Sequence, residues 1–219
     1  GPLVIDLDIS DYHPLRKGIC VCGERQLCTI CWRVFLDPAR QVLDFLLGEL
    51  MGFTQMFDVF SGRKGFHRWV CDDRVWSMNA EQRTSLMKRL ATRGAGLSTV
   101  DQTILDMLTE TWEKHFLNNV HNPVYLSMNN IRGELAAEVF AESKRQCVWD
   151  TLFPKFDMPV SCDPTHLCKL PLSPHPQTLK LTTLLPEPGQ PFDPVADTKH
   201  LDYVSHDEVM LQADFIHEI

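Results

Sequence analysis

The chain has 219 residues, of which 44% are hydrophobic and 23% are charged. This composition is typical of an ordinary soluble globular protein and excludes collagen-like, low-complexity and wholly disordered chains. The formal net charge is −8, which excludes a basic protein that simply coats nucleic acid, so any polyanion must bind a local patch. No apolar run approaches the roughly 18 residues of a membrane helix, and no signal segment opens the chain. We therefore expect a protein that is neither secreted nor membrane-bound.

The first predicted element is a strand at residues 3–9, where apolar and polar residues alternate with period two. Its apolar residues share one face, and Asp6 and Asp8 project together from the other. The apolar run around the two carboxylates predicts a central strand.

The next elements are a cysteine-rich loop and a helix. Asp37 and Pro38 are a typical N-cap and first-turn pair, so we place the helix start there and its end near residue 50. A polar turn between two apolar runs then predicts a hairpin, with strands at 57–60 and 66–71.

The middle of the chain is helical in pattern, and its last third is not. Helices are predicted at 79–93, 98–116 and 127–149, the first two with side chains at capping spacing. Ten of the 14 prolines lie from residue 154 onward, which predicts short strands and extended loops rather than helices. A faint helical spacing recurs at 205–219. Together these elements predict an α/β or α+β fold.

Asp6 and Asp8 form a candidate metal site. Two carboxylates that face the same way can share a hard divalent cation such as Mg²⁺, which prefers oxygen ligands. A solvated strand face is the alternative. Metal binding is favoured, because unpaired carboxylates would be costly to bury on a central strand. Asp157 is a candidate third carboxylate.

Four of the eight cysteines fall within twelve residues, at Cys20, Cys22, Cys28 and Cys31. Four thiolates suit a closed tetrahedral Zn²⁺ site, which has no open position and is therefore structural. His13 is a possible substitute ligand. Buried or redox cysteines are an alternative reading, and an iron–sulfur cluster is a lesser one.

A third candidate site is the polar turn of the hairpin. Two glycines let its backbone approach an anion closely, and Arg63, Lys64 and the following His67 supply positive or switchable charge. The turn lacks the strand–GxxxxGK[ST]–helix context of a Walker loop. Lys169 and His175 lie in a Pro-rich stretch that could wrap a ligand.

Taken together, these residues resemble the small catalytic subunit of archaeo-eukaryotic DNA primases, in its eukaryotic form. The resemblance is carried by LVIDLDISDY at 3–12, the cysteine cluster ending in CTICW, FSGRKGFHRWVCD at 60–72 and FPKFD at 153–157. HLCK, PHP and FDP follow in the family's order. Three departures are visible. Lys64 stands where the family commonly has a second Arg, and the family has a substantial segment before the first aspartates and a longer middle helical region.

The resemblance implies a role for each matching residue. The three catalytic, metal-binding aspartates would be Asp6, Asp8 and Asp157. The residues that bind the phosphates of the incoming nucleotide would be Ser61, Arg63, Lys64, His67 and Lys169, with His175 near its sugar. The structural zinc ligands would be Cys20, Cys22, Cys28 and Cys31.

The resemblance also implies a primase-type mixed-sheet catalytic core at 3–76 with its zinc-binding loop at 20–31. A small helical subdomain would follow at 77–150, and the chain would return to the core and a C-terminal tail at 151–219.

The implied activity is synthesis of short RNA primers from nucleoside triphosphates on single-stranded DNA, with two Mg²⁺ or Mn²⁺ ions. The implied partner is an iron–sulfur-containing large primase subunit within the polymerase α assembly, and the implied compartment is the nucleus. A primase-polymerase that extends primed templates, and a non-catalytic zinc-bearing scaffold, are the alternatives.

Overall fold

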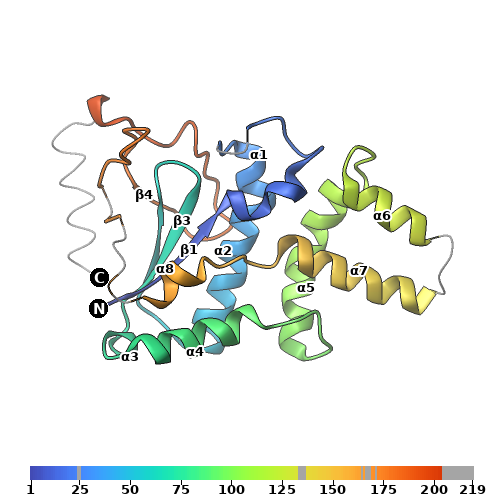
Figure 1. Cartoon of the computed structure of the whole chain (residues 1–219), viewed down its shortest axis with the longest axis horizontal. Coiled ribbons are helices and arrows are strands. Elements are labelled where there is room, and N and C mark those ends of the chain that lie inside the picture. Colours follow the sequence, from blue (N-terminus) through green and yellow to red (C-terminus); the bar gives the residue numbers. More distant parts are fainter. Residues whose placement is uncertain (24–25, 133–136, 164, 166–168, 171, 204–219) are drawn as a thin grey trace.

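The computed structural model describes all residues except 24–25, 133–136, 164, 166–168, 171 and 204–219. A sheet lies on one side of the molecule and the helices α5, α6 and α7 lie on the other, with the long helix that contains α2 between them (Figure 1). The predicted tail helix at 205–219 falls outside the described residues.

The sheet contains four strands in the order β1-β3-β2-β4, and each pair is antiparallel. The strands are β1 (Leu3–Asp8), β2 (Met56–Phe60), β3 (Gly65–Val70) and β4 (Thr183–Leu184). The predicted first strand and hairpin are confirmed. Of the two predicted fold classes, the antiparallel pairing confirms α+β, and the mixed sheet we expected has no parallel pair among the described strands.

The prediction that β1 is a central strand is wrong, since β1 lies at one edge of the described sheet. Leu3, Ile5 and Leu7 are nevertheless fully buried. The reason is that the short helix α8 (Met158–Cys162) packs beside β1 in place of another strand. Ser161 Oγ accepts a hydrogen bond from the Asp6 backbone N–H at 3.3 Å, and Asp6 O accepts one from Asp157 N–H at 3.0 Å.

The predicted helix start at Asp37 is also wrong. A continuous helix begins at α1 (Thr29–Cys31), where Cys28 is the N-cap, and continues through α2 (Asp37–Asp44). Pro38 lacks the N–H that an interior helical position donates. The helix accommodates Pro38 because the preceding turn, Trp32–Leu36, is π-helical. The final turn of the helix, Phe45–Leu50, is π-helical too. The Asp-Pro pair therefore marks a change of helical pitch instead of an N-terminus.

The helical half of the molecule follows the predicted pattern, except that one predicted helix is divided into two. It begins after α3 (Asp73–Trp76) with α4 (Ala80–Ala91), which has the expected capping box between Asn79 and Gln82. Ser98 caps α5 (Thr99–Trp112), which continues as a π-helical turn, Glu113–Leu117. The single helix predicted at 127–149 is instead α6 (Pro123–Arg132) and α7 (Ala137–Leu152). None of the helices in the described part of the chain is both long and apolar enough to cross a bilayer.

The described residues from 154 to 203 form mainly loops and turns with short pairings, in keeping with the predicted short strands and loops. They contain β4 and two isolated bridges, Pro174 to Leu181 and Lys180 to His200. The expectation that this region lacks helices is wrong at α8 and at a 3₁₀ turn, Leu201–Tyr203. Proline does not prevent α8, because Pro159 occupies its first turn, where no intrahelical N–H is required.

The face of the sheet that packs on α2 carries a buried ionic network. Asp58 on β2 accepts hydrogen bonds from Arg68 on β3 and from Arg40 on α2, with Arg40 Nε 2.8 Å from Asp58 Oδ2. The two guanidinium groups hold the pKa of Asp58 below its usual range, although burial alone would raise it. Arg40 also donates to the Pro186 carbonyl, so the network fastens the hairpin and the segment after β4 to the long helix.

Candidate active site

The candidate site is built on the opposite face of the sheet. Alternation along β1 places Asp6 and Asp8 on that face, and the antiparallel register puts Asp6 opposite His67 and Asp8 opposite Gly65 on β3. His67 Nε2 lies 3.5 Å from Asp6 Oδ1. Gly65 is required at this point because a Cβ atom there would lie 2.2 Å from the Leu7 carbonyl oxygen. The close approach brings the tip of the hairpin against the two carboxylates.

Asp157 reaches the same place from far along the chain. Its backbone N–H donates to Asp6 O, and its carboxylate caps α8 by accepting the Val160 N–H at 3.3 Å. Tyr12 fixes the approach, because its buried hydroxyl accepts the N–H of Lys155 at 3.1 Å. The chain therefore delivers a third carboxylate to the middle of β1.

The three aspartates interact electrostatically. Burial and the negative charges of Asp8 and Asp157 together raise the pKa of Asp6 to about 7, although Lys169 opposes the shift. Burial also raises the pKa of Asp11, again with Asp8 and Asp157 contributing. Crowded carboxylates of this kind are the oxygen donors that a divalent cation neutralises. The donor set therefore fits Mg²⁺ or Mn²⁺.

The carboxylates are near one another without being in tight contact. Among the described residues, the cysteines are the one group of potential ligands whose ligand atoms all lie within 4.8 Å of one another. Asp8 is held elsewhere, with Oδ2 2.9 Å from Lys64 Nζ and Oδ1 accepting the Ser10 N–H at 2.7 Å. To share a cation with Asp6, the Asp8 carboxylate must exchange its contact with Lys64.

The basic residues of the hairpin turn lie beside a later loop. Gly62 has a positive φ of 79°, and its carbonyl accepts the Thr178 hydroxyl at 2.9 Å. A Cβ atom on Gly62 would lie 2.8 Å from the Lys180 carbonyl oxygen. The two glycines of the turn thus allow close backbone contact, Gly62 with the loop that carries His175 and Gly65 with β1.

The electrostatics place four of the predicted phosphate-binding and sugar-binding residues together. Burial lowers the pKa of His175, and the positive charges of Lys169, Arg63 and Lys64 lower it further. His67 is buried on β3, and Ser61 Oγ accepts the Gly65 N–H at 3.2 Å. A positive cluster therefore lies next to the aspartates. Residues 166–168, which carry part of the sequence resemblance, lie outside the described residues.

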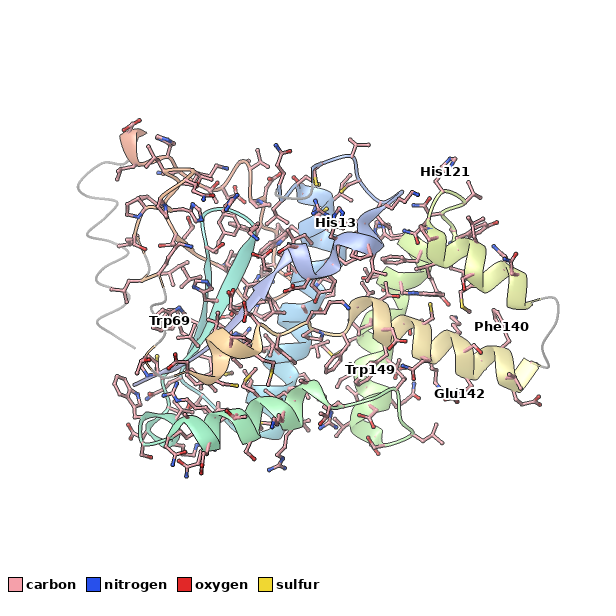
Figure 2. The ribbon with its side chains drawn as sticks, viewed as in Figure 1. His13, Trp69, His121, Phe140, Glu142 and Trp149 are labelled. Carbon is pink, nitrogen blue, oxygen red and sulfur yellow. The ribbon has the colours of Figure 1, made fainter. Side chains whose placement is uncertain are left out.

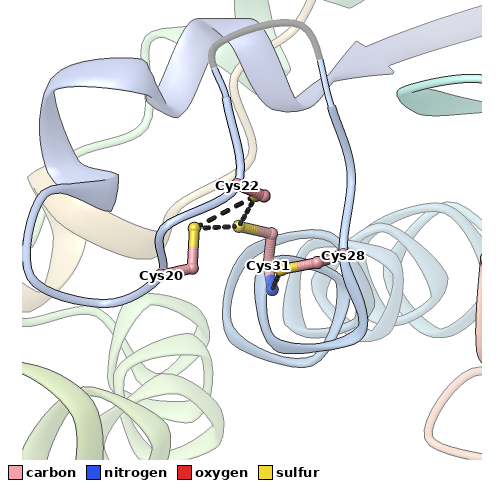
Figure 3. Close-up of side chains that lie close together, drawn as sticks. All are labelled: Cys20, Cys22, Cys28 and Cys31. Atoms are coloured by element: carbon pink, nitrogen blue, oxygen red, sulfur yellow. Dashed lines mark hydrogen bonds between the residues drawn. The ribbon is translucent and has the colours of Figure 1, made fainter.

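The four cysteines gather into one cluster (Figure 3). Cys20 Sγ lies 3.2 Å from Cys22 Sγ and 3.0 Å from Cys31 Sγ. The Cys31 backbone N–H donates to Cys28 Sγ at 3.5 Å. Four sulfurs at about 2.3 Å from a zinc ion would be about 3.8 Å apart, so small outward movements suffice. The donors fit a closed tetrahedral zinc site.

Sequence reasoning missed Arg16, which contacts this cluster. Its Nε donates to Cys31 Sγ at 3.3 Å and its Nη2 to Cys22 Sγ at 2.7 Å. Arg16 lies four residues before the first cysteine and outside any recognised spacing, so no pattern marked it. The possible substitute ligand His13 is exposed and is not part of the group of four (Figure 2).

Comparison with known proteins places these features in a family. The family model described as DNA primase small subunit matches residues 5–185. A DNA primase small subunit from Saccharomyces cerevisiae is 26% identical over 80% of this chain and 56% of its own length. One from Caenorhabditis elegans is 39% identical over 40% of this chain and 20% of its own length.

An archaeal relative from Pyrobaculum islandicum, also a DNA primase small subunit, is 35% identical over 33% of this chain and 23% of its own length. The chain thus spans at most about half the length of these relatives. The family model nevertheless covers most of the chain, including both aspartates of β1, the cysteine cluster, the hairpin and Asp157. The chain belongs to the DNA primase small subunit family.

Proposed function

We propose that this chain is the catalytic core of a DNA primase, which joins nucleoside triphosphates into short RNA primers on a single-stranded DNA template. The observation that carries the proposal is the convergence of Asp6, Asp8 and Asp157 with a cluster of positively charged side chains beside one face of the sheet. Membership of the primase small subunit family supports it.

In the proposed reaction, the three aspartates would bind the catalytic metal ions. Asp6, Asp8 and Asp157 would hold two Mg²⁺ or Mn²⁺ ions, which lower the pKa of a ribose 3′-hydroxyl and neutralise charge on the pyrophosphate leaving group. The hydroxyl oxygen attacks the α-phosphorus of the incoming nucleotide, so a phosphodiester bond forms as the bond to pyrophosphate breaks.

The basic cluster would bind the triphosphate and stabilise the charge that develops on the leaving group. Arg63 and Lys169 would do so, together with Lys64, Ser61 and His67, and His175 would contact the sugar. Lys64 would exchange its present partner, Asp8, for a phosphate oxygen. That exchange also releases the Asp8 carboxylate for metal binding.

The same proposal assigns the remaining cofactor and partners. The four cysteines would hold a structural Zn²⁺ ion. The partner would be a large primase subunit with an iron–sulfur cluster, within the polymerase α assembly. It would supply the positive charge that holds the DNA template, since this chain is acidic. The compartment would be the nucleus.

The test is unprimed synthesis with labelled ATP, poly(dT) and Mn²⁺, comparing the parent chain with Asp6→Asn and Asp157→Asn. We expect short products from the parent and none from either variant. Asp106→Asn is the matched control, since Asp106 is an exposed carboxylate on α5 whose partner is Gln102 on the same helix. It should retain full activity.

Other results would favour the rival functions. Products formed only on primed templates would indicate a primase-polymerase. A parent that melts cooperatively and binds zinc, but neither makes products nor binds a fluorescent ATP analogue, would contradict catalysis by these residues. The zinc-bearing scaffold would then be the better description.

A further inference from the structure

Arg16 makes an unusual set of contacts for an arginine. It is only 3% exposed, and it ends the 3₁₀ helix η1 (Ile9–Arg16), which begins directly after Asp8. Besides the sulfurs of Cys31 and Cys22, its Nη2 donates to the Gln26 carbonyl at 2.8 Å and to the Gly23 carbonyl at 3.2 Å. The guanidinium thus lies against two ligand sulfurs and against the loop between the cysteines.

The charge of the cluster explains why a guanidinium is suitable there. Four thiolates around one Zn²⁺ ion carry a formal net charge of −2, and a buried charge is costly unless it is paired. Arg16 halves that charge. Its Nε–H and the two N–H groups of Nη2 lie in one plane and reach both the sulfurs and the loop carbonyls, which the compact ammonium of a lysine cannot do.

We propose that Arg16 is a positioning residue of the zinc site, which compensates the thiolate charge and holds Cys22 and Cys31 in ligating orientation. The inference rests on the proposed zinc site. Donors to metal-bound groups typically contribute about 10–100-fold to metal affinity. Arg16 therefore controls how long the site retains its metal, beyond any contribution to the fold.

The experiment measures the rate at which a colorimetric chelator removes zinc from the folded protein. Arg16→Gln, which keeps donors but loses the charge and the fork, should release zinc at least about 10-fold faster. Arg16→Lys should release it at an intermediate rate. Lys17→Gln is the matched control, because Lys17 is the exposed neighbour and carries the same charge; it should behave as the parent does.

A second readout separates positioning from a purely structural role. With Co²⁺ in place of zinc, the sulfur-to-metal charge-transfer band reports on the thiolates. The positive charge of the guanidinium stabilises the sulfur lone pairs, so its loss in Arg16→Gln should move this band to lower energy. If Arg16 only donates hydrogen bonds to the loop carbonyls, the substitution would leave the band unchanged.

The possible failures can be told apart. Parent rates of zinc release and an unshifted cobalt band in Arg16→Gln would overturn the role of Arg16 while leaving the zinc site intact. A parent that binds neither zinc nor cobalt would overturn both. If Arg16→Gln does not fold, Arg16→Lys carries the test, and its release of zinc at the parent rate would overturn the proposal.

Discussion

At the scale of single residues, the buried carboxyl of Asp6 lowers the stability of the folded chain at neutral pH. The pKa of its carboxyl is raised to about 7, because the group is buried and Asp8 and Asp157 are negative. In the unfolded chain the same group ionises near its ordinary value of 3.8. Between these values the folded protein holds a proton that the unfolded chain has lost, so this group makes stability fall as pH rises from about 4 to about 7.

We therefore predict that Asp6→Asn stabilises the chain at pH 7.5 in buffer without added divalent cations. The shift from 3.8 to about 7 corresponds to at most about 4 kcal/mol of unfolding free energy. Below pH 4 the two proteins should be equally stable, which urea unfolding at both pH values would show. Added Mn²⁺ should stabilise the parent and not the variant. A difference that does not depend on pH would contradict the electrostatic explanation.

At the scale of elements, η1 connects three parts of the molecule. Its N-cap is Asp8, its middle residue Tyr12 accepts the Lys155 N–H, and its last residue is Arg16 on the cysteine cluster. Asn122, at the start of α6, donates to the Leu15 carbonyl. One short 3₁₀ helix thus fixes a candidate metal ligand, the approach to Asp157 and the cysteine loop.

Removing the Tyr12 hydroxyl should disturb two of these parts. Tyr12→Phe leaves the Lys155 N–H without its acceptor, which costs about 1–3 kcal/mol when the group is buried. It also loosens Asp157, so Mn²⁺ affinity should fall. Urea unfolding and Mn²⁺ titration measure the two effects. Tyr125→Phe, on α6, is the control and should change stability by less than about 0.5 kcal/mol; equal effects would contradict the role of η1.

The helix boundaries show which features of the fold sequence patterns can predict. The capping pair Asn79 and Gln82 marked the start of α4 correctly, because both partners lie within one helical turn. Asp37 and Pro38 misled, because a π-helical turn can accept proline inside a helix, and nothing local distinguishes that from an N-terminus. Local signals therefore identified elements well and their junctions less well.

The candidate site shows the same division. Alternation along β1 was enough to place Asp6 and Asp8 on one face, since that geometry belongs to a single strand. The edge position of β1 depends on α8, more than 140 residues away along the chain. The contacts of Arg16 depend on how the cysteine loop folds back. Neither the edge position of β1 nor the contacts of Arg16 can be predicted from residue spacing. The grouping of the site residues was predicted only through the family resemblance.

At the scale of the whole molecule, one apolar core extends through both halves. It includes residues of β1 and β3, of the long helix and of the helices α4, α5 and α7. The ring centroids of Phe35 and Phe116 lie 5.9 Å apart, across the junction between the long helix and the π-helical end of α5. The helical subdomain predicted at 77–150 thus shares a core with the sheet, so we predict that the two unfold together.

Phe116→Ala tests whether the two halves unfold together. Phe116 is fully buried, and its truncation should cost about 3–5 kcal/mol. If the core is cooperative, slow amide exchange in β3 and in α7 should accelerate by the same factor in the variant, because both report one global opening. Leu126→Ala, at a side chain 55% exposed on α6, should accelerate neither. Acceleration confined to α4, α5, α6 and α7 would instead mean that a true folding boundary lies near residue 77.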